Sequence, residues 1–286
     1  MRYLKLIIAG QCFGVEGESL TEAVKNMPGF APFLASEETT ANFDVVYSED
    51  ATEPEITVTQ YNFEADGVES VFSATNTGYH FNMVHEDGSK LVLWSVQKDR
   101  KVYLKGSLMP QLLRFALWIA YGVMSVEQGR IPIHGSCIVN DGRAYLFLGE
   151  SGTGKSTHTR LWRQYIQGSM LLNDDCPIIY AGDDGIFIYG SPWSGKTPCY
   201  HQEKYPLCGC VRLSQAPYNN ITRLPLLKAY AALHPSCPPE FAYDDTLYSG
   251  ISDTLDKILT SVGIYHLECL PDEDAAKLSY RTLSGK

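Results

Sequence analysis

The feature that most constrains this chain is the run Gly149-Glu150-Ser151-Gly152-Thr153-Gly154-Lys155-Ser156, which fits the pattern G-x-x-x-x-G-K-[ST]. Glycines at these positions let the backbone curl so that successive N–H groups point at phosphate oxygens. An apolar strand at 145–148 leads into the loop. A helix over 155–166 is expected to follow it, with its positive N-terminal end near the phosphates. The run therefore predicts a strand-loop-helix unit that binds ATP with Mg²⁺.

The polar residues of the loop have expected roles. Lys155 reaches the β and γ phosphates, and the Ser156 hydroxyl ligates the magnesium. A second run, 190–196, places small residues around Trp193 and ends in a lysine. It indicates either a loop that approaches the ligand or a tight structural turn. The residues expected to contact the nucleotide are Gly149, Ser151, Gly152, Thr153, Gly154, Lys155, Ser156, Thr157 and Lys196.

Two adjacent acids, Asp174 and Asp175, end a short apolar strand about twenty residues after Lys155. A carboxylate there can hold magnesium directly or through water, and a second can face the attacking hydroxyl. Asp174 is predicted as the metal ligand and both acids as catalytic candidates, with the identity of the base left open. His134 precedes the strands that lead into the loop. It is predicted to assist charge neutralisation or proton transfer, the alternative being a structural histidine.

The hydrophobic pattern predicts an α/β fold. Alternating apolar runs separated by Asp-Gly turns indicate an antiparallel sheet in the first hundred residues, with one helix near 20–27. An apolar segment follows and reads as a buried helix. Strands then alternate with helices and hairpins, which is typical of a mixed sheet. The expected organisation is a β-rich N-terminal domain over 1–105, a connecting helix within 106–129 and a nucleotide-binding α/β domain over 130–286.

Composition excludes several classes of function. The chain has 23 Lys and Arg against 33 Asp and Glu, a net charge of −10, so it lacks the footprint of a nucleic-acid binder. Its longest apolar stretch, 112–126, falls short of the roughly 20 residues of a membrane span. Eight dispersed cysteines favour reduced thiols and a cytoplasmic location. One group offers four potential zinc ligands, but their spacing disfavours a zinc site: Cys199, His201, Cys208 and Cys210.

Taken together, His134-Gly135, the loop 149–156 and Asp174-Asp175 resemble the motifs of HPr kinase and its relatives. The stretch 151–157 is also similar to the nucleotide loop of PEP carboxykinase, which shares that fold. The resemblance covers about 130–286 and implies a P-loop domain with a mixed sheet of the HPr kinase/PEP carboxykinase type. In HPr kinase, ATP phosphorylates a serine of a small carrier protein. The resemblance implies catalytic roles for His134, Lys155 and one of the paired acids, and a magnesium-binding role for Ser156.

The chain departs from HPr kinase at two positions. It has Thr157 where HPr kinase has a glutamate, and Phe187 where a metal-binding glutamate is expected, which argues against the family's phosphorylase activity. The leading prediction is a divergent kinase that phosphorylates a hydroxyl, with serine of a protein or peptide expected. A small-metabolite kinase or carboxykinase-like enzyme and a non-catalytic ATP-binding regulator are the alternatives, and a homo-oligomer is left open. A metabolite enzyme calls for basic residues facing the loop, and the sequence offers Arg160, Arg163 and Lys196.

Overall fold

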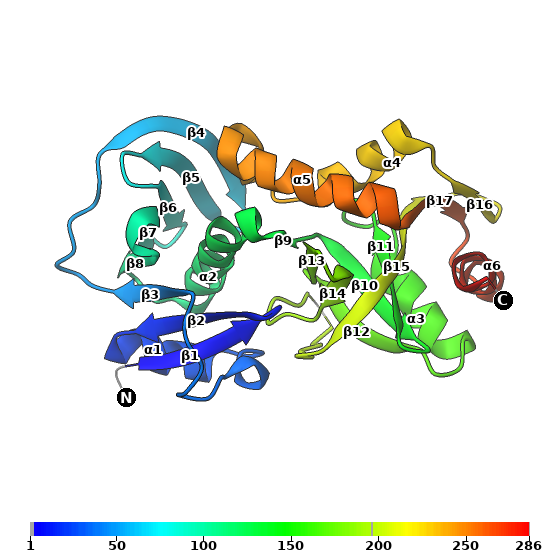
Figure 1. Ribbon diagram of the computed structural model, residues 1–286, viewed down its shortest axis with the longest axis horizontal. Helices are drawn as coiled ribbons and strands as arrows, with labels where there is room; N and C mark the ends of the chain where they lie inside the picture. Colours follow the sequence, from blue (N-terminus) through cyan, green and yellow to red (C-terminus); the bar gives the residue numbers. More distant parts are fainter. Residues whose placement is uncertain (1–2, 196, 286) are drawn as a thin grey trace. The chain divides into compact units, whose positions relative to one another are not determined.

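The computed structural model describes residues 3–195 and 197–285, which form a mixed α/β structure with two mixed β-sheets (Figure 1). The chain divides into two compact units. The first comprises residues 1–127 together with 240–248, and the second comprises 128–239 together with 249–286. The predicted mixed α/β class is confirmed at this level.

The first unit holds one sheet whose described strands follow the order β1-β2-β3-β8-β7-β6-β5-β4. The hairpins predicted at the Asp-Gly turns and the helix predicted near 20–27 are confirmed. The sheet curls around α2 (Figure 1). The elements are β1 (Tyr3–Ile8), β2 (Gln11–Glu16), α1 (Glu18–Asn26), β3 (Phe43–Tyr47), β4 (Ile56–Ala65), β5 (Val68–Thr75), β6 (Tyr79–His85), β7 (Lys90–Val96), β8 (Lys101–Gly106) and α2 (Pro110–Ser125).

This sheet is mixed, so the prediction of a purely antiparallel sheet was wrong. Strand β3 pairs in parallel with both β2 and β8. The chain passes from β2 to β3 through α1, and a connection that contains a helix is long enough to bring the chain back in the same direction. It reaches β8 only after the hairpins of β4 to β7. The sequence did not predict β3, because five residues that include Asp44 give too short a pattern.

Helix α2 supplies the centre of this unit. It is apolar on almost every side, and Leu113, Leu117 and Ala120 are among its buried residues. It therefore packs along most of its circumference, as its position inside the curled sheet requires. No helix in the described ranges combines the length and apolar composition that crossing a membrane requires.

The short stretch 240–248 packs with the first unit, although the sequence groups it with residues 130–286. The Asp244 carboxylate accepts hydrogen bonds from the Gln60 amide at 2.9 Å and the Tyr79 hydroxyl at 2.8 Å. Phe241 is fully buried against other aromatic rings of this unit. These contacts join residues 240–248 to strands β4 and β6, which lie more than 150 positions earlier in the sequence.

The second unit contains the other sheet, whose described strands run β12-β10-β11-β15-β14-β13-β9, with β17 beside β15 and β16 beside β17. The hairpins predicted among the strands of this region include one that turns at Asp141-Gly142. The elements are β9 (Arg130–Pro132), β10 (Gly135–Asn140), β11 (Arg143–Leu148), α3 (Lys155–Tyr165), β12 (Met170–Asp175), β13 (Ile178–Gly182), β14 (Gly185–Tyr189), β15 (Lys204–Gln215), β16 (Asn220–Arg223), α4 (Leu226–Leu233), α5 (Asp245–Ser261), β17 (Gly263–Cys269) and α6 (Glu273–Ser284). The first residues of α5, 245–248, belong to the first unit.

Strand directions in this sheet bring several strand ends to one edge. Strand β10 is antiparallel to both β11 and β12, while β15 is parallel to β11 and β17 is parallel to β15. The carboxyl ends of β11, β12, β15 and β17 therefore lie at the same edge, where open α/β sheets bind ligands. A core that includes Phe147, Trp162 and Leu213 anchors α3 and α6 against one face.

Candidate active site

The loop after β11 has the backbone that its glycines allow. Gly149, Gly152 and Gly154 have positive φ angles of 149°, 82° and 105°. A Cβ added at Gly152 or Gly154 would meet nothing within 4 Å, so these two glycines are needed for their conformation rather than for space. Helix α3 begins directly after them, at Lys155. The sequence-predicted order of strand, glycine loop and helix is present.

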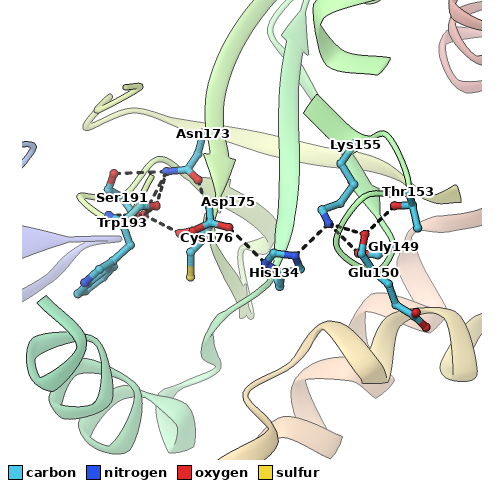
Figure 2. Close-up of polar contacts among 10 residues, drawn as sticks. All are labelled: His134, Gly149, Glu150, Thr153, Lys155, Asn173, Asp175, Cys176, Ser191 and Trp193. Carbon is cyan, nitrogen blue, oxygen red and sulfur yellow. Dashed lines mark hydrogen bonds and ion pairs between the residues drawn. The ribbon is translucent and has the colours of Figure 1, made fainter. Parts of the chain in front are cut away.

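The Lys155 ammonium lies across the mouth of this loop (Figure 2). Its Nζ donates to the carbonyls of Gly149 at 2.7 Å and Glu150 at 3.1 Å, and it lies 2.9 Å from Nε2 of His134. Burial lowers the pKa of Lys155, and the carboxylates of the paired acids offset this only in part. The amine is thus a partly desolvated cation, an environment in which it interacts strongly with an anion.

His134 links Lys155 to one of the paired acids. Its Nδ1 lies 3.3 Å from Oδ1 of Asp175, while its Nε2 faces Lys155. An ammonium group has donors only, so Nε2 is the acceptor and Nδ1 carries the proton that faces the carboxylate. The His134 and Asp175 side chains are 49% and 44% exposed, so this pair remains open to an incoming substrate. Three side chains that the sequence nominated separately therefore form one connected row.

The pairing of β10 with β12 brings this row together. Gly135 lies opposite Asp175 in that pairing. His134 directly precedes Gly135 and therefore lies next to the Asp175 carboxylate. A Cβ at Gly135 would approach the Leu146 side chain to 2.8 Å and the Phe147 carbonyl to 3.0 Å. Glycine is therefore required there by close packing against β11, which explains the His-Gly pair.

The two adjacent acids have different surroundings. Asp174 is buried, with 6% of its surface exposed, whereas the Asp175 side chain is half-exposed beside His134. The loop that follows β14 covers them: Gly195 donates its N–H to the Asp174 carbonyl at 2.9 Å, and Ser194 forms a β-bridge with Asp175. Ser156 is exposed in the first turn of α3, and no hydrogen bond joins it to Asp174 in the described structure.

A buried amide holds that covering loop in place, and the sequence did not predict it. The Asn173 Nδ2 donates to the Ser191 hydroxyl at 3.2 Å and to the Trp193 carbonyl at 3.1 Å, while its Oδ1 accepts from the Cys176 N–H at 2.9 Å (Figure 2). The loop therefore does lie against the paired acids. Lys196, the predicted phosphate contact at its end, lies outside the described residues.

A cavity of about 610 Å³ lies beside the glycine loop on the α3 side. Its volume is in the range of small-molecule sites. Thr157, which the sequence placed among the nucleotide contacts, lines it. The Gln215 amide, which also lines it, donates to the Gly152 carbonyl at 3.0 Å and so ties β15 to the loop. The other lining residues are Gly152, Thr153, Gly154, His158, Leu161, Leu213, Ala216, Pro217, Cys269, Leu270 and Pro271.

A basic residue that the sequence did not nominate lies at the other side of the loop. Arg212 is in β15, opposite Leu148 at the end of β11. Its guanidinium lies 3.6 Å from the Glu150 carboxylate and donates to the Ala232 carbonyl at 3.3 Å. Only its place in a strand parallel to β11 brings it here, and that pairing could not be identified from the local pattern.

Other sequence candidates do not join the site. Within the described ranges, no three His, Cys, Asp or Glu side chains gather as a metal-binding group. Cys199 instead donates its thiol to the Leu171 carbonyl at 3.2 Å, and Cys210 is buried within β15. Phe187 lies in β14 beneath the Lys204 ammonium, 4.5 Å from the ring centre.

No protein-family model matches this chain, and no curated protein matches it. The function of the site therefore has to be inferred from its own geometry.

Proposed function

We propose that this chain is an ATP-dependent kinase of the HPr-kinase-like P-loop type, which transfers the γ-phosphoryl group to a hydroxyl of a protein or peptide, with serine as the expected acceptor. The observation that carries the proposal is the row Asp175–His134–Lys155, with spacings of 3.3 and 2.9 Å, at the mouth of the glycine loop. A protein that only binds nucleotide has no need of an acid and a histidine aligned with the phosphate-binding lysine.

The nucleotide has a coherent place in this proposal. The curled loop and the N-terminus of α3 bind the phosphates, with Lys155 on the terminal ones. The base enters the adjacent cavity, where Leu213, Pro217 and Leu270 offer apolar surface. Apolar walls with a few polar groups are typical of small-molecule pockets.

The donor set also suits a nucleotide-bound magnesium ion. Mg²⁺ in such sites takes one or two carboxylates and completes its shell with phosphate oxygens and water. Asp174 and Ser156 would hold it, and the buried position of Asp174 fits a fixed ligand rather than a group that meets the acceptor. The ion would neutralise charge on the phosphates.

Asp175 is then the base. Its carboxylate takes the proton of the acceptor hydroxyl while the hydroxyl oxygen forms a bond to the γ-phosphorus. The bond from that phosphorus to the β-phosphate oxygen breaks, and ADP leaves with the bonding electrons. The Nδ1–H of His134 orients the carboxylate, and Lys155 compensates the negative charge of the transferred group.

The first test is phosphoryl transfer itself. The purified protein, γ-labelled ATP and Mg²⁺ are incubated with cell extract, and labelled species are identified by mass spectrometry. Lys155→Ala and Asp175→Asn are expected to reduce labelling by on the order of 100-fold, because each removes a group that acts on the transferred phosphoryl or its acceptor. Asp183→Asn, in the exposed turn between β13 and β14, is the matched control and is expected to label normally.

Equal labelling by all four proteins would contradict the proposal. A lysine- and aspartate-dependent label that appears in a small molecule, and not in a polypeptide, would replace the protein acceptor by a metabolite. ATP binding without any transfer in the presence of extract would favour the non-catalytic alternative.

A further inference from the structure

Arg212 lies on the same side of the sheet as the catalytic row. Successive residues of a strand face opposite sides, and the next residue, Leu213, lines the cavity beside α3. Arg212 therefore faces away from that cavity. Its guanidinium binds the Ala232 carbonyl, and the backbone N–H of His134 donates to the Ser236 carbonyl at 2.7 Å. One short segment, 232–236, thus contacts both Arg212 and His134.

The ionic partner of Arg212 holds it only weakly. The Glu150 carboxylate is 84% exposed and 3.6 Å away, whereas the arginine side chain is 24% exposed. An ion pair with so exposed a partner contributes little to stability, because solvent screens it. A guanidinium has five N–H donors, and among the described residues its partners are Glu150 and the Ala232 carbonyl. The cation therefore retains donor capacity beside the loop.

We propose that Arg212 is a second phosphate-binding cation of this site. When ATP binds, Arg212 gives up its ion pair with Glu150 and binds the terminal phosphate instead. This inference rests on the proposed function. With the adenine base of ATP in the cavity on the α3 side, the triphosphate runs across the loop toward Lys155 and His134. Its last phosphate is then the one on the Arg212 side.

The chemistry favours this exchange. A phosphate offers the planar guanidinium two oxygens in a matched geometry and carries more charge than a single carboxylate. Arg212 also contributes to the lowered pKa of Lys155, so the two cations are close enough to repel each other. A phosphate between them relieves that repulsion. Glu150 acts as a temporary counter-ion, which is consistent with its high exposure.

Binding measurements separate this role from a structural one. Affinities for ADP and for AMP-PNP, each with Mg²⁺, are measured by calorimetry on the full chain. Arg212→Gln is expected to weaken AMP-PNP roughly tenfold more than ADP, the loss of one charge-assisted contact. Glu150→Gln is expected to leave AMP-PNP binding unchanged or stronger. Arg223→Gln, an exposed arginine of β16, is the matched control.

Each outcome decides a different claim. If Arg212→Gln and Glu150→Gln weaken AMP-PNP equally, Arg212 only braces the loop, and the inference is wrong. An unchanged ratio of AMP-PNP to ADP affinity in Arg212→Gln also overturns it while leaving the proposed function intact. A wild-type chain that binds neither nucleotide overturns both. Melting curves check folding, and if Arg212→Gln fails to fold, Arg212→Lys must lower AMP-PNP but not ADP affinity.

Discussion

Asp174 and Asp175 are neighbours in the sequence, yet the strand they end gives them separate environments. Side chains of successive strand residues point to opposite faces. One acid is consequently buried under the loop that Asn173 anchors, and the other meets His134. The sequence predicted Asp174 as the metal ligand but did not identify which of the two acids is the base. The difference in burial favours Asp174 as the proposed metal ligand and Asp175 as the proposed base that takes the proton of the acceptor hydroxyl.

A different buried acid, Glu240, belongs to the first unit, whereas the candidate site lies in the second. It is 3% exposed, and its Oε2 has no hydrogen-bond partner in the described structure. Burial raises the pKa of Glu240 from its ordinary 4.5 to about 7. The folded chain therefore holds this proton more tightly than the unfolded chain does. Stability falls as the pH rises from about 4.5 through 7, because folding must then bury a charge.

Replacing this acid tests that account. Glu240→Gln is expected to be more stable than wild type above pH 7, by on the order of 3 kcal/mol, and to lose this advantage toward pH 4.5. The measurement is urea unfolding at several pH values. Glu22→Gln, exposed on α1, is the control and is expected to follow wild type throughout. A Glu240→Gln curve parallel to wild type at every pH would rule out the buried charge as the cause.

At the scale of elements, helices α3 and α6 are joined by one hydroxyl. Ser279 Oγ accepts from the Trp162 indole N–H at 2.8 Å and lies 2.9 Å from Nε2 of His158. All three residues are buried, and burial lowers the pKa of His158 to about 4, so the ring is neutral at neutral pH. The helix that follows the glycine loop is thus fixed from behind by the last helix of the chain.

Removing this hydroxyl leaves two buried ring nitrogens without their partner. Ser279→Ala is expected to lower the free energy of unfolding by about 1–3 kcal/mol, the cost of burying unpaired polar groups. Ser284→Ala is the control, because that hydroxyl returns to the Tyr280 carbonyl of its own helix. Chemical denaturation measures both. Equal small losses in the two variants would show that the Ser279 contacts do not hold α3.

Prediction from sequence succeeded where the signal was local. The Asp-Gly turns of the first hundred residues gave the hairpins of β4 with β5 and of β6 with β7. The parallel pairings of β3 and β15 have no local signal, because their partners lie far along the chain. For the same reason the sequence nominated His134, Lys155 and Asp175 singly. It could not show that they touch, and it did not nominate Arg212.

At the scale of the whole molecule, residues 240–248 pack with the first unit although they follow most of the second unit in the sequence. No change in composition along the chain predicts this. Asp244 caps α5, accepting from the N–H groups of Thr246 at 3.1 Å and Leu247 at 3.0 Å, and it also binds Gln60 and Tyr79. One carboxylate therefore serves a helix end and two strands of the first sheet. Its contribution to stability should exceed that of an ordinary cap.

Substitution of this carboxylate has a direct expected outcome. Asp244→Ala is expected to cost about 3 kcal/mol, the sum of a lost helix cap and of donors left unpaired. Asp245→Ala, one residue later and exposed, is the control and should change stability little. Hydrogen exchange locates the effect: amides of β4 and β6 should exchange faster in Asp244→Ala. Unchanged protection in these strands would mean that the segment contributes nothing to the first sheet.

The same segment affects how the protein is made. Domains of a nascent chain fold as units, those nearest the N-terminus first. Here the first unit lacks residues 240–248 until most of the 286-residue chain has left the ribosome. During that interval the pocket of Phe241 and the partners of Asp244 stay open. The first unit therefore completes its fold only late in translation, once 240–248 have left the ribosome, and the second unit can follow only when residues 249–286 emerge.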